Sequence, residues 1–546
     1  MQVETILVFR RYICEMAGEK CFLCPSVSTT QCELCDSKIS HCEAHQRFHR
    51  PAGDGPCFPY LVSEVAGVGR IVLAARAVTA GEELWREEEM VVGPSTKVPP
   101  VCLGCGRRVT GAVRCPGCSW PLCSLSCQEI FRHSSQECRV IAPSGPAVPD
   151  NQGQEENCPL YRVIMVLRVL QLPPDQLSYL LQFMDHGDSR EREEATPVVE
   201  TIREVWGQLE YSEELIRRVE GILDINTVEH RVTGGPSGRA FLPITSLASH
   251  SCRSNSVKDK VSRPGWVITR AKVDIKAGQE ITFHYCGGLK GRLVRREVLR
   301  EGWRFWCACE RCESQAELGA EMSSLLCEQC GGTVRPLRPL DQLSPYSCDR
   351  CPAVLEVEEV ARLETEMKEE LELCYRDDSE ALESLLGRYQ TRLHPQHWLV
   401  LIIKWLLVTT WGRVEGLRHS QLSEDILQRK LTYARQYLAA LDIVDGGISH
   451  NRGATLWEIH SVRSFLANKK MQEDRLAPVK FCEILAECLE TVREVLHTLQ
   501  FNKENSKLQV ENILHQKSFF ECYLAESKNC FRRNLNQTYM TQSQML

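Results

Sequence analysis

The sequence predicts an α+β multidomain protein in which small sheets, zinc-binding segments and a helical C-terminal region follow one another. The first observation is length, because 546 residues exceed a single domain and suit three or four. The second is the 29 cysteines, many in C-x-x-C pairs, a spacing with which two thiolates bind one tetrahedral zinc. The third is apolar periodicity, which indicates strands around residues 60–90 and 266–285 and helices beyond residue 355.

The composition is that of an ordinary globular protein, with 43% hydrophobic and 25% charged residues. A net charge of −7 argues against bulk, non-specific binding of nucleic acid. The apolar run Trp398–Val408 is short and contains Lys404, so it predicts a buried helix and no membrane span. The N-terminus lacks a signal-peptide pattern, and cysteines in a reducing compartment bind metal more often than they form disulfides. We therefore expect a protein of the nucleus and cytoplasm with no membrane partner.

The first cysteine cluster, CFLCPSVSTTQCELCDSKISHCEAHQRFH, lies within residues 1–57. Its paired and spare ligands suit two interleaved zinc ions. Whether this finger is MYND-like or B-box-like stays open. Its candidate ligands are Cys21, Cys24, Cys32, Cys35, Cys42, His45, His49 and Cys57.

The second cluster has eight candidate ligands in the order C-C, C-C, C-C, H-C between residues 102 and 138. The order and spacing resemble a MYND finger, which binds two zinc ions by cross-bracing. The resemblance also implies that proline-rich peptides of partner proteins bind this finger in extended form. It implies one site at Cys102, Cys105, Cys123 and Cys127, and a second at Cys115, Cys118, His133 and Cys138.

Two further clusters follow. The triplet Cys307, Cys309 and Cys312 is one ligand short, since a structural zinc takes four protein ligands, so it requires a partner from elsewhere. Cys252, in SHSCRSN, is a candidate, although a lone cysteine is also commonly a core residue or a reactive thiol. The last cluster is complete and predicts a zinc ribbon, which brings the expected total to about six zinc ions. Its ligands are Cys327, Cys330, Cys348 and Cys351.

The order of these segments resembles one family. Along the chain stand a strand segment, the MYND-like finger, a helical insert, SHSCRSN, AGQEITFHY and EGWRFWCACERC. This order is similar to the SMYD family of SET-domain protein-lysine methyltransferases, and most like its arthropod branch, over nearly the whole chain. The resemblance implies methyl transfer from S-adenosylmethionine to a lysine of a histone or another protein, in transcriptional or chromatin regulation.

In that family the MYND finger splits the SET domain, and a helical domain similar to tetratricopeptide units follows. The predicted domains are an N-terminal finger at 1–57, the N-terminal part of the SET domain at 58–98, the MYND finger at 99–141, a linker at 142–158, a helical insert at 159–220, the SET core at 221–302, a post-SET zinc site with the ribbon at 303–354, and the helical domain at 355–546.

The resemblance also assigns site residues. It makes Tyr285, in ITFHYC, the catalytic tyrosine, and it makes Cys252 the fourth ligand of the cysteine triplet. Phe305 corresponds to an aromatic residue that stacks near the adenine of the cofactor. The implied cofactor-binding residues are Gly67, Val68, Gly69, Asn226, Ser249, His250, Tyr285 and Phe305.

The sequence departs from the family pattern at three informative positions. Ser249 replaces an asparagine, Ser254 replaces a proline, and Trp303 replaces a second tyrosine of the lysine channel. The bulk of tryptophan narrows that channel or changes the number of methyl groups added. A second hypothesis is therefore an inactive adaptor whose zinc fingers bind other proteins. Direct DNA binding is disfavoured, because the finger segments lack a long basic helix.

Two segments are rich in charge. Residues Lys290 to Arg304 carry six basic and two acidic side chains, and residues Glu356 to Glu372 carry eight acidic and two basic ones. Solvated helix faces are the favoured interpretation of both segments. The alternatives are nucleic-acid contact for the first and recruitment of a basic histone tail for the second.

Overall fold

The computed structural model describes residues 59–96, 98–109, 113–130, 133–141, 160–186, 196–206, 211–231, 237–260 and 266–499, with a few short pieces outside them. Among those pieces, β1 (Thr30–Gln31) and β2 (Ser40–His41) pair in antiparallel fashion. All eight candidate ligands of the N-terminal finger lie outside the described residues.

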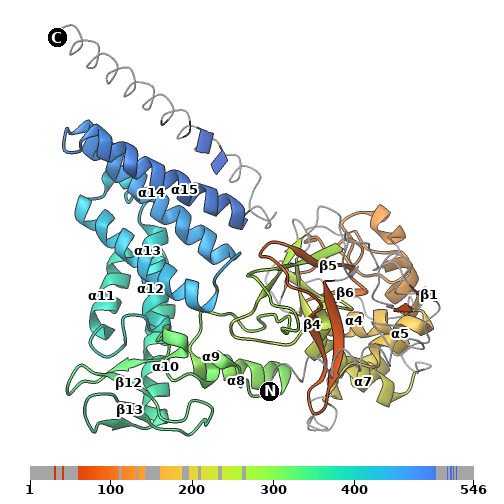
Figure 1. Ribbon diagram of the computed structural model, residues 1–546. Helices are drawn as coiled ribbons and strands as arrows, with labels where there is room; N and C mark the ends of the chain where they lie inside the picture. Colours follow the sequence, from red (N-terminus) through yellow and green to blue (C-terminus); the bar gives the residue numbers. More distant parts are fainter. Residues whose placement is uncertain are drawn as a thin grey trace, which may run out of the picture.

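Small antiparallel sheets form the first half of the described chain (Figure 1). Each of the two three-stranded sheets joins a strand from before the cysteine-rich finger to strands from after residue 226, so the fold closes over a long insertion. The strands are β3 (Tyr60–Val65) with β4 (Gly69–Ala74); β5 (Glu83–Glu88), β10 (Trp266–Ala271) and β9 (Ser256–Lys260); and β6 (Val91–Pro94), β8 (Ser237–Phe241) and β7 (Thr227–Arg231).

The finger contributes only short helices, η1 (Leu125–Glu129), η2 (His133–Glu137) and α3 (Cys138–Val140). Longer helices follow where the apolar period predicted them: α4 (Leu160–Leu170), α5 (Pro174–Leu180), α6 (Thr196–Trp206) and α7 (Glu213–Asn226). Helix α4 is mostly apolar, with two arginines, and nearly all of its side chains are buried. Ser212 caps α7, because its side chain accepts a hydrogen bond from the Leu215 N–H at 3.2 Å. This helix ends at Asn226, one of the predicted cofactor residues.

Helices α8 (Arg292–Trp303) and α9 (Glu310–Glu313) lead from the SET core to a small four-stranded ribbon. The short turns η4 (Thr245–Leu247), η5 (Glu317–Gly319) and η6 (His419–Gln421) connect other elements. The ribbon strands, neighbours in this order, are β11 (Leu325–Leu326), β12 (Thr333–Pro336), β13 (Tyr346–Cys348) and β14 (Val354–Leu355).

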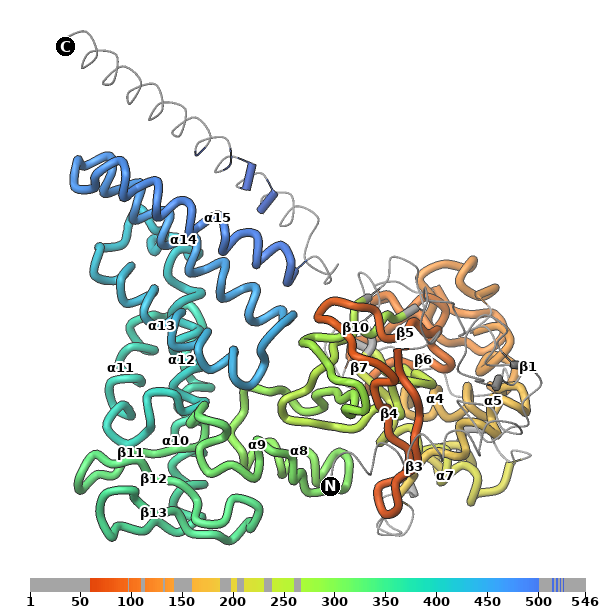
Figure 2. Tube along the Cα trace, in the orientation of Figure 1, coloured from red at the N-terminus to blue at the C-terminus, as the bar shows by residue number. Residues whose placement is uncertain are grey.

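The rest of the described chain is helical and packs around a second core. Figure 2 shows these helices stacked one above another, starting at the ribbon strands in the lower part of the view and rising to α14 and α15. They are α10 (Val357–Leu373), α11 (Ser379–Tyr389), α12 (Trp398–Thr410), α13 (Glu424–Val444), α14 (His450–Gln472) and α15 (Pro478–Leu499). Helix α12 contains the apolar run noted in the sequence and is mostly buried, with Lys404 inside. Among the described residues, the chain forms no helix with the length and apolarity needed to cross a membrane.

Candidate active site and metal centres

Two segments cross at the centre of the SET core. The backbone N–H of Phe283 donates to the carbonyl of Ser249, and the N–H of Ser251 donates back to the carbonyl of Phe283, both at 2.9 Å. Asn255 locks the same crossing, because its side-chain oxygen accepts the Thr282 N–H and its amide donates to the Glu280 carbonyl, both at 2.8 Å. The residues of SHSCRSN and of EITFHY are therefore held against each other.

The turn that leads into this crossing is anchored by a buried carboxylate. Glu87 of β5 accepts hydrogen bonds from the backbone N–H groups of Ile244, at 2.7 Å, and Thr245, at 3.0 Å. Burial raises the pKa of Glu87, although these donors and the Trp85 indole oppose the shift. Substitution of Glu87 would therefore be expected to shift the turn at residues 244–248 and, with it, Ser249.

Tyr285 lies at the end of the crossing. Its hydroxyl donates to the carbonyl of Ala248 at 2.6 Å, and its ring lies 5.3 Å from the ring of Trp303. Burial raises the pKa of Tyr285 well above its ordinary value, so the hydroxyl stays protonated at physiological pH. The predicted catalytic tyrosine therefore lies next to Trp303, the residue that replaces the second tyrosine of the family's lysine channel.

His250 is surrounded by the other predicted residues. Its ring centroid lies 5.2 Å from that of Tyr285 and 6.1 Å from that of Phe305. Burial, aided by the charges of Arg295 and Arg311, lowers the pKa of His250 to about 4, so the ring is neutral. Both ring nitrogens have protein partners: Nδ1 accepts the Tyr285 N–H, and Nε2 lies 3.3 Å from Cys252 Sγ.

Asn226 is linked to the same region through its backbone. The Ser246 hydroxyl donates to the Asn226 carbonyl at 2.7 Å, while the Asn226 amide donates to the carbonyl of Met184 at 2.8 Å. A cavity of about 380 Å³ lies beside it, a size within the usual range for small-molecule sites. Its lining includes Asp224 and Ile225, just before Asn226 in the chain, and Arg304, just before Phe305, but not Asn226 or Phe305 themselves.

The glycine turn lies apart from these residues. Gly67 and Gly69 both have positive φ values, as the tight turn between β3 and β4 requires, and Val68 is 64% exposed. A Cβ added to either glycine would meet no atom within 4 Å, so the turn faces open space. Just after the turn, Arg70 donates to the Gln182 carbonyl at 3.1 Å. Two residues after Gln182, the carbonyl of Met184 accepts the hydrogen bond of the Asn226 amide.

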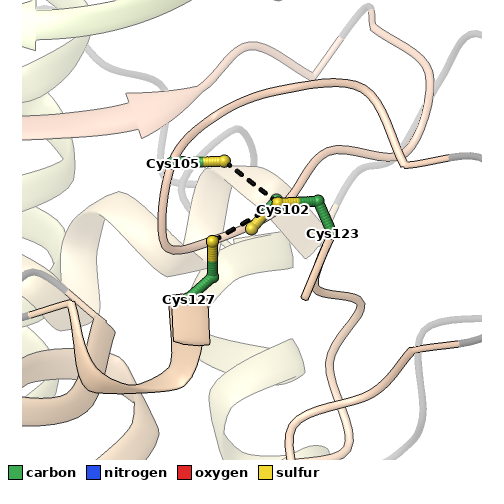
Figure 3. Close-up of side chains that lie close together, drawn as sticks. All are labelled: Cys102, Cys105, Cys123 and Cys127. Carbon is green, nitrogen blue, oxygen red and sulfur yellow. Dashed lines mark hydrogen bonds between the residues drawn. The ribbon is translucent and has the colours of Figure 1, made fainter. Parts of the chain in front are cut away.

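The finger brings its eight candidate ligands into two groups. Figure 3 shows the first group, in which four sulfurs point toward one another. Four sulfurs placed tetrahedrally about 2.3 Å from a zinc ion lie about 3.8 Å apart. In this structure Cys105 and Cys123 are 3.4 Å apart, and Cys115 and Cys138 of the second group are 3.6 Å apart. The groups are Cys102, Cys105, Cys123 and Cys127, and Cys115, Cys118, His133 and Cys138, so both donor sets fit zinc.

A buried arginine joins both finger sites to the SET sheets. His133 Nδ1 lies 2.9 Å from the carboxylate of Glu137, and that carboxylate forms a two-point ion pair with Arg168 of α4. Arg168 also donates to the carbonyl of Leu103, in the first site, and to that of Val92, in β6. A carboxylate behind a ligating histidine fixes the orientation of its ring. The finger is therefore packed as part of the SET core.

The triplet at Cys307, Cys309 and Cys312 meets Cys252. The sulfur of Cys252 lies 3.9 Å from that of Cys307 and 3.6 Å from that of Cys312, as a tetrahedral zinc site requires. Among the three readings of Cys252 in the sequence, the geometry favours a ligand. The ribbon cysteines form a fourth group, Cys327, Cys330, Cys348 and Cys351, which is more exposed.

The arginines of α8 correct one expectation. A solvated basic face was predicted, but Arg292, Arg295 and Arg296 are buried, because each is turned toward the post-SET segment. Arg295 donates to Cys252 Sγ at 3.2 Å and pairs with Glu317 at 2.6 Å. Burial alone would raise the pKa of Glu317, but the charges of Arg295, Arg311 and Arg292 outweigh it and lower that pKa to about 2. These arginines are thus not available to nucleic acid.

Comparison with known proteins defines the class first. The model of the SET domain matches residues 29–286, a range that contains both crossing segments and both finger sites. The chain therefore carries a SET domain.

Individual relatives show which SET-domain proteins this chain resembles. The SET domain-containing protein SmydA-8 of Drosophila melanogaster is 26% identical in isoform A over 54% of this chain and 29% identical in isoform B over 52%. The histone-lysine N-methyltransferase ASHR1 of Arabidopsis thaliana is 24% identical over 56% of this chain and 67% of its own length. This chain spans 64% of the length of each fly protein. The resemblance to the SMYD family, and to its arthropod branch, is confirmed.

Proposed function

We propose that the chain is a protein-lysine methyltransferase that uses S-adenosylmethionine. The observation that carries this proposal is the placement of Tyr285, whose hydroxyl is held on the Ala248 carbonyl where the two SET segments cross. The similarity of the chain to SET-domain methyltransferases supports the same reading. A histone or another protein would supply the lysine.

S-adenosylmethionine, when bound, supplies an electrophilic methyl group on its sulfonium sulfur. The protein has to present a neutral lysine amine in line with that group, which is a task of orientation. Tyr285 suits it, because a protonated hydroxyl fixed by Ala248 is a rigid polar group beside the amine. The Trp303 ring, 5.3 Å from that of Tyr285, would bound the space beside the hydroxyl and narrow the approach of the lysine.

Residues around the cavity next to α7 suit the cofactor. Asn226, Ser249 and Phe305 would bind its polar and adenine parts. None of these three residues lines the cavity, but Asp224, Ile225 and Arg304, which lie within two residues of Asn226 or Phe305 in the chain, do. His250 contributes through its backbone and ring packing, since its two nitrogens have other partners. The turn of Gly67, Val68 and Gly69 would contact the methionine portion only if it moved inward from open space.

Two experiments test this function. Calorimetric titration with S-adenosylmethionine should show binding, and radiolabelled methyl transfer to histones or to cell extract should disappear in Tyr285→Phe. This variant removes only the hydroxyl that is bonded to Ala248, so it should still bind the cofactor. Absence of cofactor binding in the wild-type protein would favour the adaptor hypothesis, in which the fingers bind partner proteins. Full labelling by Tyr285→Phe would show that another residue orients the amine.

The pH dependence follows from the protonation states. A lysine amine has an ordinary pKa of about 10.4, so the neutral fraction rises about tenfold per pH unit below that value. The raised pKa of Tyr285 keeps its hydroxyl protonated over the same range. The ratio kcat/KM should therefore rise from pH 7 to 9 with a slope near one on a logarithmic scale. A decline within this range would contradict the assignment of Tyr285 as a protonated group.

The remaining domain assignments are part of the same proposal. We infer that residues 99–141 are a MYND finger inserted into the SET domain, that it binds proline-rich peptides, and that helices α10 to α15 stack like tetratricopeptide units. The described cysteine groups suit four zinc ions, and the N-terminal finger would bring the total to about six. Elemental analysis of the purified chain tests this number. Residence in the nucleus and cytoplasm is proposed from the many cysteines in C-x-x-C pairs, which suit metal binding in a reducing compartment.

A further inference from the structure

The imidazole of His250 joins a metal ligand to the backbone of Tyr285. The Tyr285 N–H donates to His250 Nδ1 at 3.1 Å, and on the other side of the ring Nε2 lies 3.3 Å from Cys252 Sγ. A nitrogen that accepts a hydrogen bond carries no proton, so the ring's one N–H is at Nε2. Nε2 therefore donates to the sulfur of Cys252.

Tyr285 depends on this segment at both ends. Its hydroxyl is bonded to Ala248, and its backbone N–H is bonded to the ring of His250, two residues later. A parallel bridge between His250 and Phe283 aligns the two strands just before this point. The position of the tyrosine is thus defined by residues 248–250, and chiefly by one side chain among them.

Cys252, in turn, is placed by the four-cysteine site. Its sulfur lies within 4 Å of the sulfurs of Cys307 and Cys312, and it accepts a second hydrogen bond from Arg295 at 3.2 Å. The residue is fully buried, so no solvent competes for the sulfur. Groups that donate to a metal ligand orient it and tune the metal, and their loss typically lowers metal affinity by about 10–100-fold.

We propose that His250 is a positioning residue that couples the metal state of the four-cysteine site to the placement of Tyr285. With a zinc ion bound, Cys252 is fixed, the His250 ring is fixed on it, and the Tyr285 N–H is fixed on the ring. Without the ion, the sulfur is free to turn away and the ring loses its anchor. The catalytic consequence rests on the proposed methyl transfer, whereas the coupling itself does not.

The test compares two histidine-to-phenylalanine variants of the full chain. His250→Phe removes both hydrogen bonds and keeps a planar ring. His394→Phe is the matched control, because His394 Nδ1 also accepts a backbone N–H two residues along the chain, that of Gln396, at 3.2 Å. In His250→Phe the Tyr285 amide should exchange its hydrogen about fivefold faster. One zinc ion should pass to a competing chelator about tenfold faster. Neither change should occur in His394→Phe.

A conservative variant separates coupling from general damage. The amide of glutamine both accepts and donates, so His250→Gln should recover part of the slow amide exchange and of the zinc retention. Replacement of zinc by the larger cadmium ion should alter exchange at Tyr285 in the wild-type chain and leave it unaltered in His250→Phe. An equal response to cadmium in the two proteins, or glutamine behaving no better than phenylalanine, would overturn the coupling.

The kinetic readout tests the link to the proposed function. His250→Phe should lower kcat about tenfold and leave the KM for the lysine substrate within about twofold, as a misplaced orienting group does. If the wild-type chain transfers no methyl group, the proposed function fails, while amide exchange and zinc release still decide the coupling. If the wild-type chain is active and His250→Phe matches it in all three measurements, the coupling is wrong and the function stands.

Discussion

The two cysteine sites that follow the SET core differ in how the chain closes them. The first joins Cys252 to three cysteines at least 55 residues later, is almost wholly buried, and is backed by Arg295 and Glu317. The second closes within one short ribbon, from Cys327 to Cys351, and has Cys330 exposed. Each site has four cysteine sulfurs, so the two sites differ in the residues that surround the sulfurs and not in the type of ligand. The site at Cys252 can therefore hold distant functional segments together, whereas the ribbon site stabilises only its own segment.

The largest expected effect is that of Cys252→Ser. This change removes the ligand that ties the crossing segments to the post-SET triplet and takes from the buried Arg295 the nearer of its two sulfur partners. We expect loss of one zinc ion and of about 5 kcal/mol or more in the free energy of unfolding, which puts it among the most damaging substitutions. Elemental analysis and thermal unfolding measure the two losses.

Cys286→Ser is the matched control. Cys286 is buried next to the same site but is not one of its four candidate ligands. It should keep the zinc content of the wild-type chain. Equal zinc loss in the two variants would mean that Cys252 is not a ligand.

The next effect in size is that of Glu317→Gln. Glu317 is buried and pairs with Arg295 at 2.6 Å and with Arg311 at 3.2 Å, so its neutralisation leaves two buried cations without their carboxylate partner. We expect a loss of about 3 kcal/mol in the free energy of unfolding. Glu321→Gln removes a similar pair with Arg335, which is partly exposed, and should cost less than about 1 kcal/mol. Denaturant unfolding of both variants should give this order, and similar losses would contradict the contrast between the regions.

Cys330→Ser should affect the ribbon alone. The ribbon closes locally, so its opening is expected to be a separate, low-energy event. We expect loss of one zinc ion and a shift of about 2 °C or less in the Tm of the main transition. Hydrogen exchange should rise in residues 325–355 and stay unchanged around Tyr285. Faster exchange at Tyr285 would show that the ribbon also supports the SET core.

The smallest effect concerns rate only. A chelator added to the intact chain should take zinc from the exposed ribbon before it takes zinc from the buried site at Cys252. Native mass spectrometry combined with exchange of the ribbon peptides gives the order of release. If the site at Cys252 empties first, burial does not govern access to the metal.

Much of the metal chemistry could be predicted from spacing. The spacing within the cysteine pairs of the finger and the ribbon predicts metal sites there, because two ligands of a tetrahedral ion are often separated by two residues. Cys252 needed the resemblance as well, since nothing nearby in the sequence points to a partner after residue 300. Tyr285 and His250 were likewise placed by the family pattern, and the structure brings them to one point.

The charged network behind these sites could not be predicted. In sequence, Arg292, Arg295 and Arg296 look like the solvated face of a basic helix, because a single helix does not reveal which of its faces is covered. The burial of Arg295 depends on Glu317, and that of Arg168 depends on Glu137, which lies in a different segment. Glu87 and Asn255 were missed for the same reason. Their partners are backbone groups of turns, which carry no sequence signal.

The crossing of residues 249–251 over residue 283, with Cys252 bonded to a later triplet, also sets the order of events during synthesis. The ligands Cys252 and Cys307 are 55 residues apart, so at about 5–20 residues per second the ribosome needs about 3–11 s to produce the second after the first. During that interval the later cysteine ligands that complete the site of Cys252 have not yet been made. The four-cysteine site can therefore be completed only after residue 312 has been made, and a shortage of zinc would leave this site open in newly made chains.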